Sequence, residues 1–290
     1  MNENKVEQKK KGVYKNLLSG GISASIARTV TNPIERLEIL RQVGNTDYKG
    51  LSLSESVTKF YKTQGVTGLF KGNSASIARI FPYSAIEFYS FEFYKNFLIR
   101  GEQNKSRQNS IFYTVICGGL TGLNAITLTF PLDVARTRLA VDTLNSPIKE
   151  KSIFTSLNHL WKAEGIRGLY KGYSVAFFGS IPYVAIKQTT FDLMKTHFMI
   201  DKYRGALNFI YGAFSGVLGT VLLYPSYMIR RVLQANDKKE MKLLDHANQI
   251  FKNQGLSGFY KGLSMTLIKI VPYQGLLFWI NEKLKVIFKY

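Results

Sequence analysis

The chain has 290 residues and a formal net charge of +20, from 39 lysines and arginines against 19 aspartates and glutamates. Its mean hydropathy of −0.05 is that of an ordinary soluble protein, although the average hides long apolar segments. The bases are spread along the chain without a nucleic-acid-binding motif, so the charge does not indicate a nucleic-acid partner. Cys117 is the single cysteine, which excludes an intramolecular disulfide framework.

The chain opens on a polar tail, residues 1–12, that lacks the apolar core of a secretory signal and the arginine-rich pattern of a transit peptide. We therefore expect any targeting signal to be internal. Further along, residues 108–132 and 205–229 contain no charged side chain, and each run is long enough to cross a bilayer. The other candidate spans carry isolated charges, as membrane helices that line a cavity do.

Three copies of one unit make up most of the chain. The block GLFKG at 68–72 returns as GLYKG at 168–172 and as GFYKG at 258–262. Prolines recur at fixed places around these blocks: Pro33, Pro131 and Pro225 before them, and Pro82, Pro182 and Pro272 after them. This repetition predicts repeats at 13–100, 111–200 and 201–290, with a polar linker at 101–110 between the first two.

Each repeat is expected to form two long helices and a short one. The first long helix contains a proline, which bends an apolar helix without abolishing it. A short amphipathic helix follows at about 51–64, 152–164 and 241–254, and a glycine turn leads into the second long helix. The predicted fold is an all-α membrane protein with six transmembrane helices in three tandem pseudo-symmetric repeats.

Charged residues recur at equivalent places in the long helices. Each second helix has an acid and a base ten and thirteen residues after its proline, on one helix face. These residues are Glu92 and Lys95, Asp192 and Lys195, and Glu282 and Lys285. Three unrelated surface pairs are the alternative, but identical offsets in three repeats favour a threefold ring.

The first helices carry a second set of charges, two and five residues after their prolines. The middle repeat has a complete acid–base pair, Asp133 and Arg136, in the stretch FPLDVARTRL. The other repeats depart from it: the first has Glu35 and Glu38, and the third has Tyr227 and Arg230.

Together these motifs resemble the mitochondrial carrier family, from about Val13 to Phe288. The family pattern is Pro-x-acid-x-x-base on odd helices and aromatic-acid-x-x-base on even ones. The resemblance implies six tilted helices around a cavity in the mitochondrial inner membrane, with the three short helices on the matrix side. It also implies a matrix gate and a cytoplasmic gate, which open alternately.

The resemblance assigns the odd-helix residues to the matrix gate and the even-helix ring to the cytoplasmic gate. Pairing each acid with the next odd helix predicts the links Glu35–Arg136, Asp133–Arg230 and Tyr227–Glu38. The last link uses a tyrosine hydroxyl, which can donate a hydrogen bond to a carboxylate. Gln42 and Gln234 occupy the places of bracing glutamines.

Differences between the repeats indicate where an asymmetric substrate binds. Arg79, Gly179 and Lys269 stand three residues before the even-helix prolines. Two cations and a glycine at one level suit phosphate groups and a flat moiety, although either cation could instead be a fixed structural charge. The complete predicted set of substrate contacts is Arg28, Arg79, Glu87, Gly179, Ser180, Lys187 and Lys269.

Three glycine turns complete the set of predicted sites. Gly72, Gly172 and Gly262 each precede a helix, and helix N-termini bind phosphate. In the resembling family these turns bind cardiolipin, so they are the predicted lipid contacts. The three histidines fit no metal spacing, and no phosphate-loop or nucleophile motif occurs, so no metal, cofactor or catalytic site is predicted.

The sequence therefore predicts a multi-pass inner-membrane carrier and not an enzyme. Its substrate is predicted to be a phosphate-bearing anion of the adenine nucleotide or coenzyme A type, moved by alternating access. The altered matrix gate leaves one alternative, a carrier-fold accessory subunit of a larger respiratory assembly with little or no transport.

Overall fold

The computed structural model describes residues 3–48, 50–99, 107–142, 152–198, 204–235 and 243–287, and every regular element within these ranges is a helix. The six long helices are α1 (Glu3–Gln42), α3 (Asn73–Ile99), α4 (Arg107–Val141), α7 (Tyr173–Phe198), α8 (Arg204–Ala235) and α10 (Leu263–Ile287). The shorter elements are η1 (Thr46–Tyr48), α2 (Leu53–Leu69), α5 (Ile153–Glu164), α6 (Ile166–Leu169), α9 (Leu243–Gln254) and η3 (Leu256–Tyr260).

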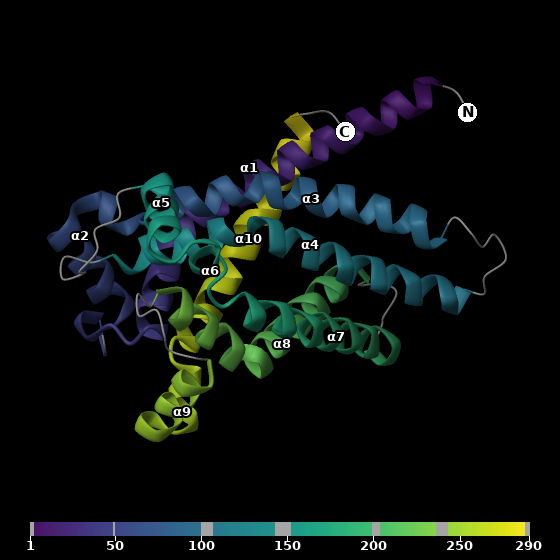
Figure 1. Ribbon diagram of the computed structural model, residues 1–290. Coiled ribbons are helices and arrows are strands. Elements are labelled where there is room, and N and C mark those ends of the chain that lie inside the picture. Colours follow the sequence, from purple (N-terminus) through teal and green to yellow (C-terminus); the bar gives the residue numbers. More distant parts are fainter. Residues whose placement is uncertain are drawn as a thin grey trace.

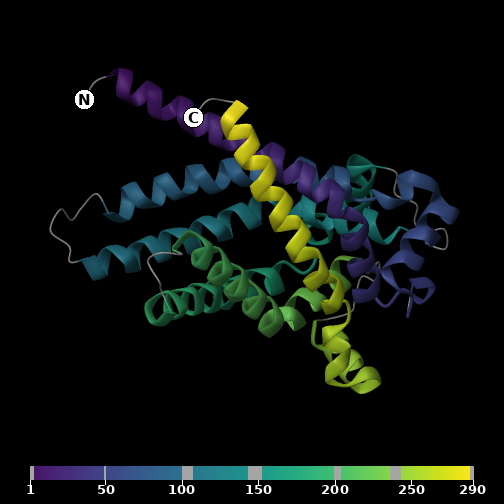
Figure 2. The same cartoon turned by 180° about the vertical axis from the view of Figure 1, so that it is seen from behind.

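The long helices pack in pairs that join neighbouring repeats. α3 lies along α4, α7 along α8, and α1 along α10, so the last repeat closes onto the first (Figure 1). The short helices α2, α5 and α9 gather at one end of the bundle, away from both chain ends (Figures 1 and 2).

The predicted proline positions lie inside the long helices, which continue through them. α1 contains Pro33, α4 contains Pro131 and α8 contains Pro225. Helix bounds differ modestly from the prediction. α1 already begins at Glu3, within the polar tail, and α4 begins at Arg107, within the predicted linker, whose residues 101–106 lie outside the described part of the chain.

Each repeat has its own small core, at the end where the short helices lie. In the first repeat, Leu37 and Leu40 of α1 pack with Phe60 of α2. In the second, Phe130 and Val134 pack with Leu160 of α5; in the third, Tyr224 and Met228 pack with Ile250 of α9. These cores hold the helical turn after each odd-helix proline, and so they fix the positions of the predicted matrix-gate residues.

The three glycine turns bring each repeat against the next one. Gly72, Gly172 and Gly262 have φ of 82°, 76° and 86°, a left-handed conformation that L side chains rarely adopt. A Cβ atom on each would lie 2.9 Å, 3.2 Å and 3.1 Å from the carbonyl oxygens of Arg136, Arg230 and Glu38 respectively. All three turns therefore touch the gate position five residues after the proline of the following odd helix.

The outer surface carries many large apolar side chains. Phe97 is 77% exposed, Val286 is 76% exposed and Phe178 is 70% exposed. Within the described residues, the segments Ile210–Ala235 and Leu256–Ile287 are long and apolar enough to cross a membrane by length and composition. Exposed apolar surface of this kind suits contact with lipid.

Candidate functional site

The charged residues of α1, α4 and α8 meet at the end of the bundle where the short helices lie. The Arg136 guanidinium forms an ion pair with the Glu35 carboxylate. Arg230 Nη2 lies 2.6 Å from Asp133 Oδ2. The structure thus brings together two of the three predicted partnerships, α1 with α4 and α4 with α8.

The third predicted link, Tyr227–Glu38, does not form between these two described residues, which have other partners. Glu38 Oε2 instead accepts from Lys269 Nζ at 2.6 Å, and the same ammonium lies 3.3 Å from Glu35 Oε1. The Tyr227 ring packs edge-on against the Tyr183 ring, with centroids 6.1 Å apart. A buried carboxylate needs compensation, and a full positive charge supplies more than a phenol hydroxyl does.

Asp133 is the most heavily bonded carboxylate of the site. Its Oδ2 accepts from Arg230, from Gln234 Nε2 at 2.8 Å and from Arg231 Nη1 at 3.2 Å. Arg231 also donates to Thr137 Oγ1 at 2.7 Å. Sequence reasoning placed Gln234 here but missed Arg231, which adjoins Arg230 and is an arginine in this repeat alone.

A second overlooked residue, Tyr224, connects α8 to α1. Its hydroxyl accepts from Gln42 Nε2 at 2.8 Å and donates to the Lys261 carbonyl at 3.0 Å. Gln42 also approaches Glu38 Oε1 at 3.3 Å. The tyrosine contact between α8 and α1 therefore exists, but it lies one helical turn before Tyr227 and bonds a glutamine.

Arg36 ties the first repeat to the second outside the ring of ion pairs. Its guanidinium donates to Gln64 Oε1 at 3.0 Å and to the Gly68 carbonyl, both in α2. It also donates to the carbonyls of Ala140 at 3.0 Å and Asp142 at 2.7 Å, at the end of α4. Sequence reasoning gave Arg36 no role, because valine and methionine occupy the equivalent places in the other repeats.

A cavity of about 410 Å³ adjoins the ion pairs of the predicted matrix gate, and Asp133 and Arg230 line it. Arg79 lines it, with Nη1 3.6 Å from Asp133 Oδ1 and its guanidinium 5.5 Å from the Tyr83 ring centroid. Arg28 lines it from α1, 5.7 Å from the Tyr273 ring centroid. The predicted cations of α1 and α3 therefore lie beside the predicted matrix-gate residues.

Positive charge exceeds negative charge around this cavity. The cations of the cavity and gate are Arg28, Arg79, Arg136, Arg230, Arg231 and Lys269, and the carboxylates are Glu35, Glu38 and Asp133. Six cations share three carboxylates, which leaves a net excess of three positive charges within this set. Such an excess in a low-dielectric cleft attracts anions.

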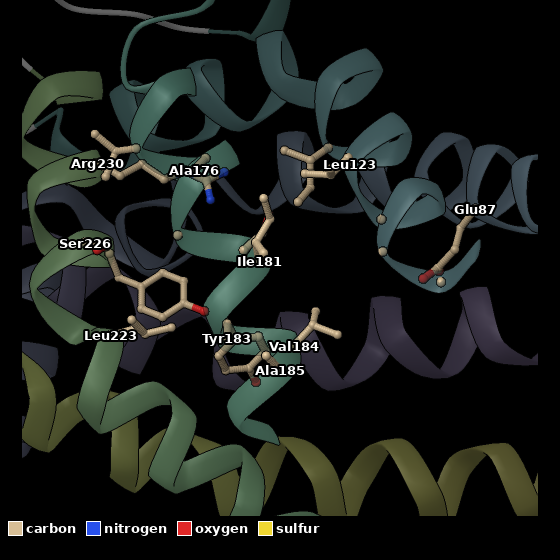
Figure 3. A pocket seen from close by; sticks show the side chains of 18 of the residues that line it. Glu87, Leu123, Ala176, Ile181, Tyr183, Val184, Ala185, Leu223, Ser226 and Arg230 are labelled. Atoms are coloured by element: carbon tan, nitrogen blue, oxygen red, sulfur yellow. The ribbon is translucent and has the colours of Figure 1, made fainter. Parts of the chain in front are cut away.

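A second cavity, of about 490 Å³, adjoins the first. It lies between α3 and α4 on one side and α7 and α8 on the other, and Figure 3 shows Leu123 and Glu87 across it from Ile181 and Val184. Gly179 and Ser180 also line it, whereas Lys187 is exposed and is not among the lining residues of either cavity.

The predicted cytoplasmic ring lies toward the opposite end of the long helices. Lys285 bonds Glu282 at 2.9 Å within α10, and Gln188 donates to Asp192 at 3.1 Å within α7. In the part of the chain that the structure describes, no ion pair joins Glu92 or Lys95 to another helix. Among the described residues, the ion pairs between long helices lie at the predicted matrix gate.

Three similar helical units around a cavity, tied by ion pairs at one end, define a membrane transporter built from carrier repeats. The family model described as mitochondrial carrier protein matches residues 9–102, 107–202 and 201–290. The chain therefore belongs to the mitochondrial carrier family, whose members are transporters and not enzymes, and its fold is the mitochondrial carrier fold.

Similar proteins include several carriers of this family. A mitochondrial substrate carrier family protein P of Dictyostelium discoideum is 31% identical over 97% of this chain and 96% of the relative. Mitochondrial carrier protein CoAc1 of Arabidopsis thaliana is 30% identical over 93% of this chain and 88% of the relative. The mitochondrial adenine nucleotide transporter ADNT1 of the same plant is 28% identical over 95% and 87% respectively.

Proposed function

We propose that this carrier moves a phosphate-bearing anion, of the adenine nucleotide or coenzyme A type, across the mitochondrial inner membrane. The observation that carries the proposal is the excess of three positive charges around the cavity of about 410 Å³. A carboxylate or an amino acid would leave much of this charge uncompensated, and unpaired charge at membrane depth is costly. A polyphosphate supplies several negative oxygens at once, and arginine binds them in a planar, bidentate geometry.

The proposed binding roles follow from where each side chain lies. Arg28 and Arg79 face the cavity and hold phosphate oxygens. Gly179 and Ser180 border the uncharged part of the substrate in the adjoining cavity, which Glu87 also lines. Lys187 is exposed on α7, where it attracts the incoming anion before it reaches the cavity.

Lys269 has a double role in this proposal. It bonds Glu38 at 2.6 Å and Glu35 at 3.3 Å in the closed gate. An anion that draws Lys269 away leaves these carboxylates without that partner, which weakens the contact between α1 and α10. Binding thus favours opening of the matrix gate, after which the six residues of the predicted cytoplasmic ring close the other end. Alternating access follows from this exchange.

Relatives that match nearly the whole chain support a substrate of the adenine nucleotide or coenzyme A type. The family includes relatives whose names specify coenzyme A-type and adenine nucleotide carriers, at about 30% identity to this chain. Proteins of the family sit in the mitochondrial inner membrane, and we propose the same location here. The accessory-subunit alternative rested on the altered gate, and the Glu38–Lys269 ion pair gives that gate a third link, so no observation now favours it.

We further propose that cardiolipin binds at Gly72, Gly172 and Gly262. Each turn directly precedes a long helix, α3, α7 or α10, whose first backbone N–H groups can donate hydrogen bonds to a phosphate. Each glycine also follows a lysine in the sequence.

A thermal-shift screen of the purified protein tests the proposed substrate class. A ligand that binds the folded state raises its unfolding temperature in proportion to the logarithm of its concentration over Kd. ADP and coenzyme A should raise the midpoint, and malate and glutamate should not. A shift with malate or glutamate alone would overturn the proposal.

A further inference from the structure

Two of the three boundaries between repeats have the same ion pair at the level of the predicted matrix gate. At the boundary between α3 and α4, Arg79 lies 3.6 Å from Asp133. At the boundary between α10 and α1, Lys269 lies 3.3 Å from Glu35. In both cases the residue three before an even-helix proline is a cation, and it contacts the acid two after the next odd-helix proline.

The third boundary, between α7 and α8, has lost both members of this arrangement. Gly179 stands in the place of the cation, and Tyr227 stands in the place of the acid. The space is not filled by another charge: a Cβ on Gly179 would lie 3.4 Å from Cβ of Ser226, the neighbour of Tyr227. An acid at position 227 would have no cation on α7 to contact, so the two replacements belong together.

Tyr227 occupies the junction of the two cavities. It lines both of them, as do Tyr83, Ile126 and Arg230. Its ring meets the Tyr183 ring nearly at right angles, with an interplanar angle of 82°. The side chain is only half-buried, and no gate carboxylate uses it, because Glu38 is bonded to Lys269.

From these contacts we infer that Tyr227 is a substrate-contacting residue that sets specificity, and not a member of the matrix gate. With Tyr183 it forms an aromatic wall that receives the flat, uncharged base of the substrate, while the phosphates lie among Arg28, Arg79 and Lys269. The inference rests on the proposed function and deepens it, because it names the element that distinguishes a nucleotide from a phosphate lacking a base.

The chemistry of the two cavities supports this division. Guanidinium groups attract phosphates, whereas an acid at position 227 would repel them at the junction of the two cavities. A purine base has a polarisable face that stacks on tyrosine, and removing such an aromatic partner costs about 1–3 kcal/mol per base in other proteins. Replacing the gate acid by tyrosine therefore removes a repulsion and adds a surface for the base.

The test compares ADP with pyrophosphate, which has the charge of a polyphosphate but no base. The dissociation constants of both probes are measured by thermal shift in the wild-type protein, Tyr227→Leu and Tyr227→Phe. Leucine retains apolar volume without a π face, and Tyr227→Ala is a second truncation should Tyr227→Leu fold poorly. Tyr89→Leu is the control, because Tyr89 is 74% exposed and is not among the lining residues of either cavity.

We expect Tyr227→Leu to weaken ADP binding about tenfold, the factor equivalent to 1.4 kcal/mol, with pyrophosphate binding unchanged. Tyr227→Phe should bind both probes as the wild type does. Equal weakening of ADP and pyrophosphate, or no change in either, would overturn the inference while leaving the proposed function standing. A wild-type protein that binds neither probe would overturn the proposed function, and this inference with it.

Discussion

Lys269 offers the sharpest mutational test of the proposed matrix gate, because the structure gives it an ion pair that its sequence position did not predict. Its side chain is 19% exposed and that of Glu38 is 11% exposed, so solvent screens their ion pair little. Removing one partner of a buried pair costs about 3–5 kcal/mol, since the other charge stays buried and unpaired. The remaining exposure of Lys269 favours the lower end of this range.

Lys269→Gln should therefore destabilise the gate-closed protein by about 3 kcal/mol and lower its thermal midpoint by several degrees. The double variant Glu38→Gln/Lys269→Gln should recover most of the loss, because two amides can bond each other without an uncompensated charge. Lys283→Gln is the matched control: it removes an exposed lysine from the same helix.

The assay is thermal unfolding of the purified protein without substrate, for the wild type, both single variants, the double variant and the control. A Lys269→Gln midpoint equal to that of Lys283→Gln would refute the ion pair. Additive losses in the double variant would do the same, because residues in one ion pair are coupled.

Three further changes test the supporting structure. Gly172→Ala should lower the thermal midpoint more than Gly165→Ala does. Both positions have positive φ, but only a Cβ at 172 meets a carbonyl oxygen of α8, that of Arg230 at 3.2 Å. Arg36→Met, which introduces the residue of the third repeat, should lower the midpoint by the equivalent of about 3 kcal/mol, because four acceptors lose a buried charged donor. The pKa of Glu55 is lowered by its hydrogen bonds from the Ser52 backbone N–H and hydroxyl, so α2 should lose this cap only as pH falls below the usual 4.5 toward the lower folded value. Hydrogen exchange of residues 51–64, measured against pH, should show this loss of protection, and Glu55→Gln should remove the pH dependence.

The repeat pattern predicted the architecture well, because it depends on spacing alone. Fixed offsets of proline and glycine located every long helix and both regular gate partnerships, Glu35 with Arg136 and Asp133 with Arg230. The short helices also began within about two residues of the expected places, where Ser52 and Ser152 cap the first two.

The irregular contacts could not be read from spacing. Threefold symmetry places position 227 opposite position 38, but Glu38 bonds the strongest partner within reach, and that partner is Lys269 of the adjoining helix. The sequence gives no measure of which of two allowed partners is nearer. Tyr224 and Arg231 escaped notice because the family pattern has no polar role at their positions.

If the cationic cavity binds a phosphate-bearing anion for transport, the purified protein should exchange ADP in liposomes. Purified protein is reconstituted with internal ADP, and uptake of labelled ADP is compared with uptake of labelled malate, for the wild type and Arg79→Ala. We expect ADP uptake that Arg79→Ala abolishes, with no malate uptake in either protein. Malate uptake that is indifferent to Arg79→Ala, without ADP uptake, would contradict it.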